Sequence, residues 1–502
     1  MKRFVLILLA ALLCLPALPA LAEDTPYRIT MIANFGSTSN TEESEADRIF
    51  FENLGDRFDM EIEIQIPPAP TYNESVQVMF ASGDYPDVVQ FDENTDKVFV
   101  DAVRGGLILP LNDYLESCPN LIQYSYDVSW DAMKVLGDDG IYGVPRTSIA
   151  RADGYGFRRD WLEKLGIDVK DGEYITLEQL EEIARVFTFG DPDGDGRDNT
   201  YGISVQNTDG NLTPQFPWTF GLNGWQEYDG EYMNLVYSRD HDNYKRALQW
   251  THDRWEEGVI DPDWPTLATG DAYNERFRIG ITGMKIFFPG HLTDFIKVTQ
   301  AIDPDFDLVF VPGIVESEES GSYFGGAYTN GFWGLWSVTA AAEQPERIMA
   351  MFDYLLSDEG WTTTMYGPEG VTWTTDENGD KVALDAYATY HWGKATLRRN
   401  NDPAFFVSLA EDSASRERIE RLIGLCIDQC RFPLDGGFRP SVCDDPIYID
   451  YQKYMAAEVT KIIMGERPVD DWDEILDGWY AAGGEQYVAE MQAFIAAKQK
   501  KE

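Results

Sequence analysis

The chain has 502 residues and a formal net charge of −47 at pH 7, from 87 acidic and 40 basic side chains. So negative a surface repels nucleic acids and anionic membranes, which excludes both as expected partners. The length exceeds what one hydrophobic core organises, so we expect two or more lobes.

The N-terminus has the pattern of a secretory signal peptide. Lys2 and Arg3 precede an apolar run over residues 4–18, and residues 20–22, Ala-Leu-Ala, form a small-x-small cleavage site. A lipoprotein is the alternative and would use Cys14, but the preceding Leu13 is bulkier than the residue usually found there. No other run reaches the ~18 apolar residues of a membrane span, so we expect a soluble, extracytoplasmic mature chain that is periplasmic, cell-surface or secreted.

Alternating strand and helix patterns open the mature chain. Strands are expected over 27–33, 61–66 and 87–91, with helices over 45–58 and 72–81 between them. Strand, helix, strand in this order predicts a parallel sheet with crossover helices, and therefore an α/β fold. Asn34 and Phe35 follow the first strand at the edge where open parallel sheets place ligands, so both are candidate ligand contacts.

A helix over residues 176–189 leads into an acidic loop. It begins with a capping box, TLEQ, and its apolar residues recur at helical spacing. The loop GDPDGDGRDNTYG over 190–202 matches the first half of an EF-hand calcium loop. The expected calcium ligands are Asp191, Asp193, Asp195, the carbonyl of Arg197, and Asn199.

The second half of this loop departs from the EF-hand pattern, since Gly202 stands where a bidentate Glu is usual. The missing ligands would come from Asn199, Asp198, water or a distant residue. An acidic, solvated turn without a metal is the alternative. Nothing beside the loop resembles a reacting centre, so calcium is expected in a structural role.

Several segments of the sequence resemble, in the same order along the chain, those of a known protein family. They are ASGDYPDVVQFD (81–92), GLILPLNDYLE (106–116), GIYGVP (140–145), FRRDWLEKLGID (157–168), the helix and loop over 176–203, EGVIDPDW (257–264) and YLLSDEGWTTTMYGPEGVTWT (354–374). Together they resemble the extracellular solute-binding proteins of family 1 of ABC importers, which are maltose-binding-like. The calcium loop is similar to that of the larger, LipO-type members, which include alginate-binding proteins.

The resemblance implies a periplasmic-binding-protein-like fold of type II. Two discontinuous α/β lobes would be joined by a hinge, with a ligand cleft between them. The first lobe would comprise residues 27–142 and 325–360, and the second residues 144–322 and 361–502. The chain would cross between the lobes near Gly143, Tyr323 and Trp361.

Aromatic residues in expected loops are candidates for sugar contacts. A pyranose ring packs its C–H bonds on a flat aromatic face, while its hydroxyls need polar partners. The aromatic candidates are Trp218, Trp225, Trp333 and Trp373. Core packing is the alternative for each of them. Arg146 follows the first crossing and could hold a hydroxyl or a carboxylate, or alternatively a salt bridge at the hinge.

Four cysteines follow the expected cleavage site: Cys118, Cys426, Cys430 and Cys443. Four cysteines allow three pairings, and the i, i+4 spacing of Cys426 and Cys430 suits a disulfide poorly. We expect buried thiols or one long-range bridge.

Enzyme signatures such as G-x-S-x-G, H-E-x-x-H and a Walker loop are absent from the sequence. We therefore expect a binding protein without catalytic activity. It would act as a monomer, capture a carbohydrate in the form of an oligosaccharide by hinge closure, and deliver it to the transmembrane subunits of an ABC permease. A secreted, calcium-stabilised carbohydrate-active enzyme is the alternative.

Overall fold

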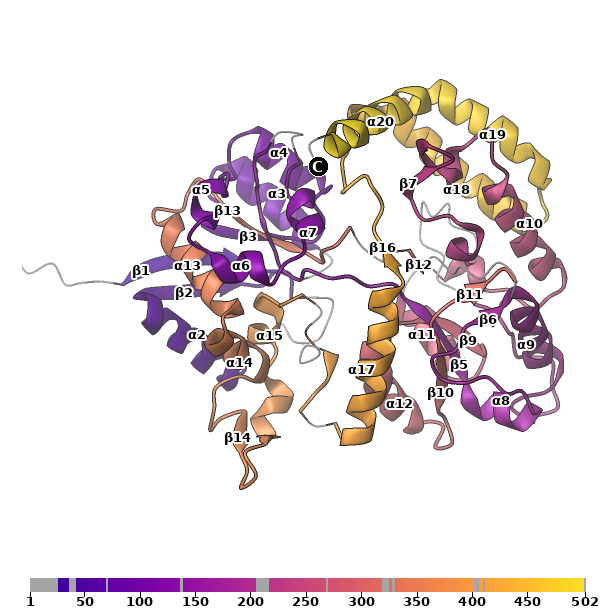
Figure 1. Ribbon diagram of the computed structural model, residues 1–502, viewed down its shortest axis with the longest axis horizontal. Helices are drawn as coiled ribbons and strands as arrows, with labels where there is room; N and C mark the ends of the chain where they lie inside the picture. Colours follow the sequence, from indigo (N-terminus) through magenta and orange to yellow (C-terminus); the bar gives the residue numbers. More distant parts are fainter. Residues whose placement is uncertain are drawn as a thin grey trace, which may run out of the picture.

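The computed structural model (Figure 1) describes residues 26–35, 42–68, 71–135, 139–204, 216–267, 270–317, 325–326, 330–400, 402, 406–409 and 411–500. The expected signal peptide and the crossing near Tyr323 lie outside these residues. Among the described residues, no helix combines the length and the apolar character that crossing a bilayer requires.

The first lobe is built on a five-stranded sheet in the order β2-β1-β3-β13-β4. Its strands are β1 (Tyr27–Ile32), β2 (Met60–Gln65), β3 (Val88–Phe91), β4 (Val144–Pro145) and β13 (Leu335–Val338). β1 is parallel to β2 and β3, which confirms the parallel start of the expected α/β fold, whereas β13 runs antiparallel to β3 and β4. All four residues of β3 are buried, as a central strand covered on both faces requires.

Helices pack around this sheet (Figure 1). They are α2 (Glu45–Phe58), α3 (Tyr72–Ser82), α4 (Lys97–Arg104), α5 (Asn112–Leu115), α6 (Pro119–Gln123), α7 (Asp127–Ala132), α13 (Pro345–Leu356), α14 (Asp358–Tyr366) and α15 (Trp392–Thr396). A hairpin of β14 (Trp373–Thr375) and β15 (Lys381–Ala383) follows α14. Ser44 and Asp47 close a capping box at the start of α2.

The second lobe has a three-stranded antiparallel sheet in the order β10-β5-β9. Its strands are β5 (Gly154–Arg158), β9 (Met284–Phe287) and β10 (Leu308–Val311). Short pairs flank it: β6 (Ile175–Thr176) with β11 (Ile314–Val315), β7 (Trp225–Tyr228) with β8 (Glu231–Asn234), and β12 (Gly325–Gly326) with β16 (Cys430–Arg431).

Long helices complete the second lobe. They are α8 (Arg159–Leu165), α9 (Leu177–Phe189), α10 (Asn243–Glu256), α11 (Gly270–Arg278), α12 (Leu292–Gln300), α17 (Ser413–Asp428), α18 (Pro446–Ile463), α19 (Trp472–Trp479) and α20 (Glu485–Gln499). α10, α18, α19 and α20 form an outer layer of this lobe in Figure 1. Their buried faces share one core with β5 and β10.

The packing shifts two of the expected lobe boundaries. Residues 144–145 form the edge strand β4 of the first sheet, so the chain leaves the first lobe after Gly143 and not at it. Trp361, Tyr390 and Trp392 belong to the hydrophobic core of the first lobe, although residues from 361 onward were expected in the second. The segment that contains Tyr390 and Trp392 is held there because the Asp47 carboxylate in α2 accepts hydrogen bonds from the backbone N–H groups of His391 and Trp392.

The two lobes also touch near the C-terminus. Asn94, three residues after β3, donates from Nδ2 to the Gly436 carbonyl at 3.3 Å, and Lys498 of α20 pairs with Asp131 of α7 at 2.9 Å. Figure 1 shows the end of α20 beside the helices of the first lobe. The carboxyl end of β3 therefore faces the second lobe.

The four cysteines are free thiols, so the expected long-range bridge is absent among these described residues. Burial raises the pKa of the Cys118 and Cys430 thiols to about 11. Both are protonated at neutral pH and therefore poor nucleophiles.

Candidate functional site

Polar and aromatic side chains gather at the carboxyl ends of β1 and β3. The Asn34 side chain donates from Nδ2 to the Asp92 carboxylate at 2.9 Å, and its backbone N–H donates to Gln90. Phe35 lies against Trp336 and Trp392, with ring centroids 6.2 and 6.0 Å apart. Asn34 and Phe35 are thus both at the expected sheet edge, and both are half-buried.

Arg146 joins this edge from the segment that leaves the first lobe. It is 6% exposed, and its guanidinium lies 5.4 Å from the ring centroid of Trp333. Its Nη1 donates to the Ala395 carbonyl at 3.1 Å, while its Nε has no hydrogen-bond partner among the described residues. Burial lowers the pKa of Arg146 to about 10, although the negative charge of Asp92 acts in the opposite direction.

A second arginine, the half-buried Arg398, lies beside the same tryptophan. Its guanidinium is 5.8 Å from the Trp333 ring centroid, and its Nε donates to the Lys394 carbonyl at 2.9 Å. Burial lowers the pKa of Arg398 well below its usual value, and the like charge of Arg146 lowers it further. Trp333 itself is 40% exposed, which is unusual for so large an apolar ring. The group formed by Asn34, Asp92, Arg146, Trp333 and Arg398 is called the arginine–tryptophan site below.

The other expected aromatic contacts are not part of this site. Trp225 is 2% exposed and packs with Met491 and Ile495 of α20, and Trp373 is 7% exposed and donates from Nε1 to the Gly367 carbonyl. Both rings are buried, as the alternative of core packing expects. Trp218 is half-buried on the 3-10 helix Pro217–Phe220 of the second lobe.

Two members of the arginine–tryptophan site, Asp92 and Arg398, were not predicted from the sequence. Asp92 follows β3 as Asn34 follows β1, so the strand-end argument could have found it. Arg398 lies about 250 residues after Arg146 in the chain, and nothing around it marks a site. A backbone hydrogen bond from the Arg398 N–H to the Arg146 carbonyl, at 2.9 Å, brings the two together.

The acidic loop forms a compact group of carboxylates on the second lobe. One oxygen each of Asp191, Asp193 and Asp195 lies within 4.8 Å of the others. Gly194 and Gly196 have φ values of 76° and 75°, and this left-handed backbone is the one that the tight turn needs. Three converging oxygens suit a hard cation such as calcium. The Asn199 side chain donates to Asp195 at 3.1 Å, so it supports the group as well.

Packing explains why the twelfth loop position is glycine. A Cβ on Gly202 would lie 2.3 Å from the Ala184 Cα of α9, which leaves no room for any side chain. The Gly202 N–H donates to the Thr188 hydroxyl at 3.0 Å, and the Thr200 hydroxyl donates to the Phe187 carbonyl at 2.8 Å. The loop therefore returns against α9, and a glutamate ligand at this position is sterically excluded.

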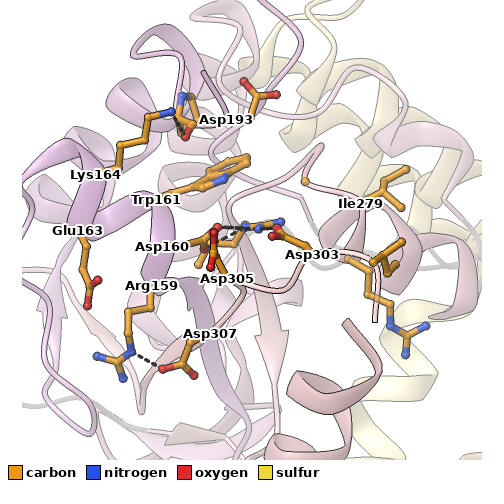
Figure 2. Close-up of a pocket in the computed structure, with 15 residues that line it drawn as sticks. Arg159, Asp160, Trp161, Glu163, Lys164, Asp193, Ile279, Asp303, Asp305 and Asp307 are labelled. Atoms are coloured by element: carbon orange, nitrogen blue, oxygen red, sulfur yellow. Dashed lines mark hydrogen bonds and ion pairs between the residues drawn. The ribbon is translucent and has the colours of Figure 1, made fainter. Parts of the chain in front are cut away.

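A hollow of about 950 Å³ adjoins this loop (Figure 2). Charged side chains line it, but they pair with one another: Arg158 with Asp160 at 2.6 Å, and Arg159 with Asp307 at 2.7 Å. Lys164 caps the rim by donating to the Pro192 carbonyl at 2.7 Å. These mutual ion pairs occupy charged groups of the hollow and leave them little binding capacity for a ligand.

Comparisons with known proteins identify relatives of this chain. A family model described as bacterial extracellular solute-binding protein matches residues 42–360. The polygalacturonan/rhamnogalacturonan-binding protein YtcQ of Bacillus subtilis is 23% identical over 463 residues, covering 87% of this chain and 86% of that protein. The fructooligosaccharide ABC transporter substrate-binding protein FusA of Streptococcus pneumoniae is 26% identical over 42% of each chain.

Solved structures share the fold. The alginate-binding protein AlgQ2 without calcium ion has a TM-score of 0.67 and 18% identity, covering 94% of this chain and 98% of that chain. FusA of Streptococcus pneumoniae in complex with kestose has a TM-score of 0.67 and 18% identity, covering 95% of this chain and all of that one. The two-lobed type II architecture is therefore the fold of this chain.

Proposed function

Because the chain belongs to the bacterial extracellular solute-binding protein family, we propose that it captures an oligosaccharide outside the cytoplasm and delivers it to the permease of an ABC importer. The position of Trp333 carries the proposal. Its ring is 40% exposed at the carboxyl edge of the first sheet, where a sugar can stack on it. Arg146 lies beside this ring, Asn34 and Phe35 lie at the carboxyl end of β1 in the same sheet, and Trp218 would approach from the second lobe.

Capture follows from hinge closure. A ligand held on the first lobe gains further contacts when the second lobe closes on it, so it shifts the population towards the closed form by the difference in affinity. The first lobe would be residues 27–142 and 330–360, extended by 144–145 and 361–397, and the second lobe would be the remainder of the described chain, including β12 (Gly325–Gly326), which pairs with β16. The membrane subunits of the permease would then recognise the closed form.

Calcium would have a structural role in this function. The carboxylates of Asp191, Asp193 and Asp195 would hold the ion, with the Arg197 carbonyl and Asn199 as further ligands. The ion would neutralise three carboxylates that repel one another and would fix the loop against α9. Residues 1–22 would direct the chain out of the cytoplasm as a cleaved signal peptide.

No catalytic role is proposed. The curated relatives named above are binding proteins, and the arginine–tryptophan site contains a single carboxylate, Asp92, among the described residues. A glycosidase of the usual kind needs two carboxyl groups across the scissile bond. The secreted carbohydrate-active enzyme is thus the weaker alternative.

A thermal-shift screen of the chain without residues 1–22 tests the proposal. Neutral oligosaccharides, uronic-acid oligosaccharides and amino acids are compared in calcium and in EGTA, since a ligand that binds only the folded state raises Tm. We expect a rise with one class of oligosaccharide and a fall in EGTA. A rise with amino acids alone would contradict carbohydrate capture, and conversion of a bound oligosaccharide to shorter products would contradict a pure binding role.

A further inference from the structure

The two lobes touch at a place where the chain does not cross between them. The chain leaves the first lobe after β4, whereas this contact joins the segment after β3 and the helices α4 and α7 to residues 435–444 and the end of α20. We propose that the contact is an interlobe latch, which holds the second lobe against the first and favours the closed form before a ligand binds. The latch consists of Asn94, Arg104 and Asp131 on the first lobe and of Gly436, Asp444 and Lys498 on the second. The latch itself goes beyond the proposed function, and only its effect on ligand affinity rests on that function.

A buried side chain of the first lobe lies at the interlobe latch. Asn94 is 2% exposed, and its Nδ2 donates to the Ala132 carbonyl at 2.7 Å and to the Gly436 carbonyl of the second lobe at 3.3 Å. Gly437 lies so close to it that a Cβ on this glycine would be 2.4 Å from the Asn94 Nδ2. Packing as tight as this requires one relative position of the two lobes.

Two ion pairs join the same elements. Lys498, in the last turn of α20, pairs with Asp131 of α7 at 2.9 Å, and their side chains are only 23% and 27% exposed. Arg104 of α4 lies 3.8 Å from Asp444 at a more exposed position. Burial raises the pKa of Asp131, but the hydrogen bonds and charges of Lys134 and Lys498 outweigh it and lower the pKa below its usual value. Asp131 is therefore ionised at neutral pH, and the pair with Lys498 carries full charges.

The interlobe latch lies on the side of the first lobe that carries the arginine–tryptophan site. Asn94 follows Asp92 by two residues, after the carboxyl end of β3. Helix α7 packs against the segment that bears Trp333, since a Cβ on Gly331 would lie 2.5 Å from Val128 of that helix. A contact on the side where the ligand is proposed to bind forms only when the lobes approach each other there. It therefore belongs to the closed form.

The effect of the latch on binding follows from the equilibrium between open and closed lobes. The apparent affinity of a protein falls with the fraction of molecules in the binding-competent form, so contacts that favour this form raise affinity without touching the ligand. One partly buried ion pair and one hydrogen bond should each shift this equilibrium by about two- to tenfold. A bias of this size keeps closure reversible, so a bound solute can still be released.

Small-angle X-ray scattering tests the latch on the chain without residues 1–22, saturated with calcium and without carbohydrate. Lys498→Glu places a second carboxylate against Asp131, so we expect the lobes to separate and the radius of gyration to rise. Lys500→Glu is the matched control, because Lys500 is exposed two residues further on and forms no ion pair within the described chain. Its radius of gyration should equal that of the wild type. At about 1 M salt, which screens the pair, the wild type should expand as well.

Two neighbouring glycines test the contact without a change of charge. Gly436 and Gly437 have φ values of 52° and 76°, so alanine brings backbone strain at either position. Only the methyl group of Gly437→Ala overlaps Asn94, whereas a Cβ on Gly436 meets nothing closer than the flexible end of Lys498, 3.7 Å away. Gly437→Ala should therefore raise the radius of gyration, and Gly436→Ala should not.

Isothermal titration calorimetry with galacturonate trimer and with kestose measures the effect on affinity. Lys498→Met should weaken binding of whichever trisaccharide the wild type binds by about two- to fivefold, and Lys498→Glu by about tenfold or more. Asp131→Asn should act as Lys498→Met does. The double variant should bind no more weakly than either single variant, because both changes remove the same ion pair.

The outcomes separate the latch from the proposed function. An unchanged radius of gyration in Lys498→Glu or in Gly437→Ala, or an equal rise in their controls, would overturn the latch. Tighter binding by these variants would place the contact in the open form, and expansion with unchanged affinity would remove its link to capture, so either result contradicts the proposal. If neither trisaccharide binds the wild type, the proposed function loses its support for these two sugars, while the scattering result still decides the latch.

Discussion

Two charged regions of this protein place opposite charges in opposite surroundings. Arg146 is buried and Arg398 is half-buried beside Trp333 at the edge of the first sheet, whereas Asp191, Asp193 and Asp195 lie in an outer loop of the second lobe. Backbone hydrogen bonds fix the positive pair, and the surrounding protein screens its charges poorly. The negative triad is accessible to water and salt, so its charges are screened. Burial thus separates a preorganised, poorly screened pair of charges from an exposed, screened triad.

The largest effects should come from replacing a buried and an exposed tryptophan, because the first change should lower stability and the second should weaken ligand binding. Trp225→Ala removes a ring packed on Met491 and Ile495 and should lower the free energy of unfolding by about 3–5 kcal/mol. Trp333→Ala should change the free energy of unfolding by less than about 1 kcal/mol but weaken oligosaccharide binding roughly 10- to 100-fold. Urea unfolding and calorimetric titration measure both. Equal stability losses in the two variants would remove the distinction between packing and site.

Calcium removal tests the negative triad. At a free calcium concentration 100 times the Kd, the bound ion should stabilise the folded protein by about 2.7 kcal/mol, so EGTA should lower Tm. The Asp191→Asn and Asp193→Asn double variant should have the lower Tm already and lose its response to EGTA. Asp240→Asn, the same change at an exposed position elsewhere on the second lobe, should respond as the wild type does. An unchanged wild-type Tm in EGTA would refute the calcium loop.

Gly202→Ala tests whether packing against α9 or calcium binding requires glycine at the end of the acidic loop. The added Cβ overlaps Ala184 of α9, so we expect a loss of about 1–3 kcal/mol in the free energy of unfolding, with calcium or with EGTA. Gly424→Ala is the matched control, because Gly424 lies within α17 and a Cβ there meets nothing within 4 Å. The control should be neutral or slightly stabilising. A loss seen only in calcium would assign Gly202 to the metal site.

The smallest effect on stability is expected at Asp171, whose negative charge is already compensated by Arg418 and Arg421. Burial raises the pKa of Asp171, but the bonds and charges of Arg418 and Arg421 outweigh it and hold the pKa below its usual value. A carboxylate with a depressed folded-state pKa contributes stability above its unfolded pKa of about 3.9, and this contribution disappears as the pH falls through the folded pKa. Asp171→Asn should therefore cost about 1–2 kcal/mol at pH 7, and less below pH ~4.

Unfolding curves at pH 7 and pH 3 measure this change. The same stability difference at both pH values would mean that Asp171 acts through packing and not through its charge. Unlike Arg146, this carboxylate has its partners within the chain, since Arg418 and Arg421 lie 2.9 and 3.1 Å away. Its substitution should leave ligand affinity unchanged.

Local patterns were sufficient for much of the fold. Strands expected over 27–33, 61–66 and 87–91 match β1, β2 and β3, because alternating or continuous apolar residues specify half-buried and central strands. The capping box at Thr176 is formed, since Thr176 and Gln179 satisfy each other's backbone N–H. The acidic loop also has the geometry that its Asp and Gly spacing indicates. Each of these features depends on residues close together in the chain.

The residues of the proposed ligand site were only partly predictable, because they come from distant parts of the chain. Asn34, Phe35 and Arg146 could be chosen from their positions beside strands, but a tryptophan in a loop pattern can be buried by a helix that is hundreds of residues away. Trp225 is covered by α20, and Trp373 turns its Nε1 to the Gly367 carbonyl. The expected lobe boundary near Trp361 is shifted for the same reason. The backbone N–H of Trp392 donates to the Asp47 carboxylate and holds this segment in the core of the first lobe.

Periodicity, caps and turn residues act over a few positions, so the sequence alone was enough to predict most elements, the acidic loop and the family resemblance. Which aromatic rings are exposed and which charged side chains are brought together follows from the folded chain. Arg146, Trp333 and Arg398 become one site solely through backbone pairing between distant segments. Burial and long-range pairing are properties of the folded chain, and they decide what that site can bind.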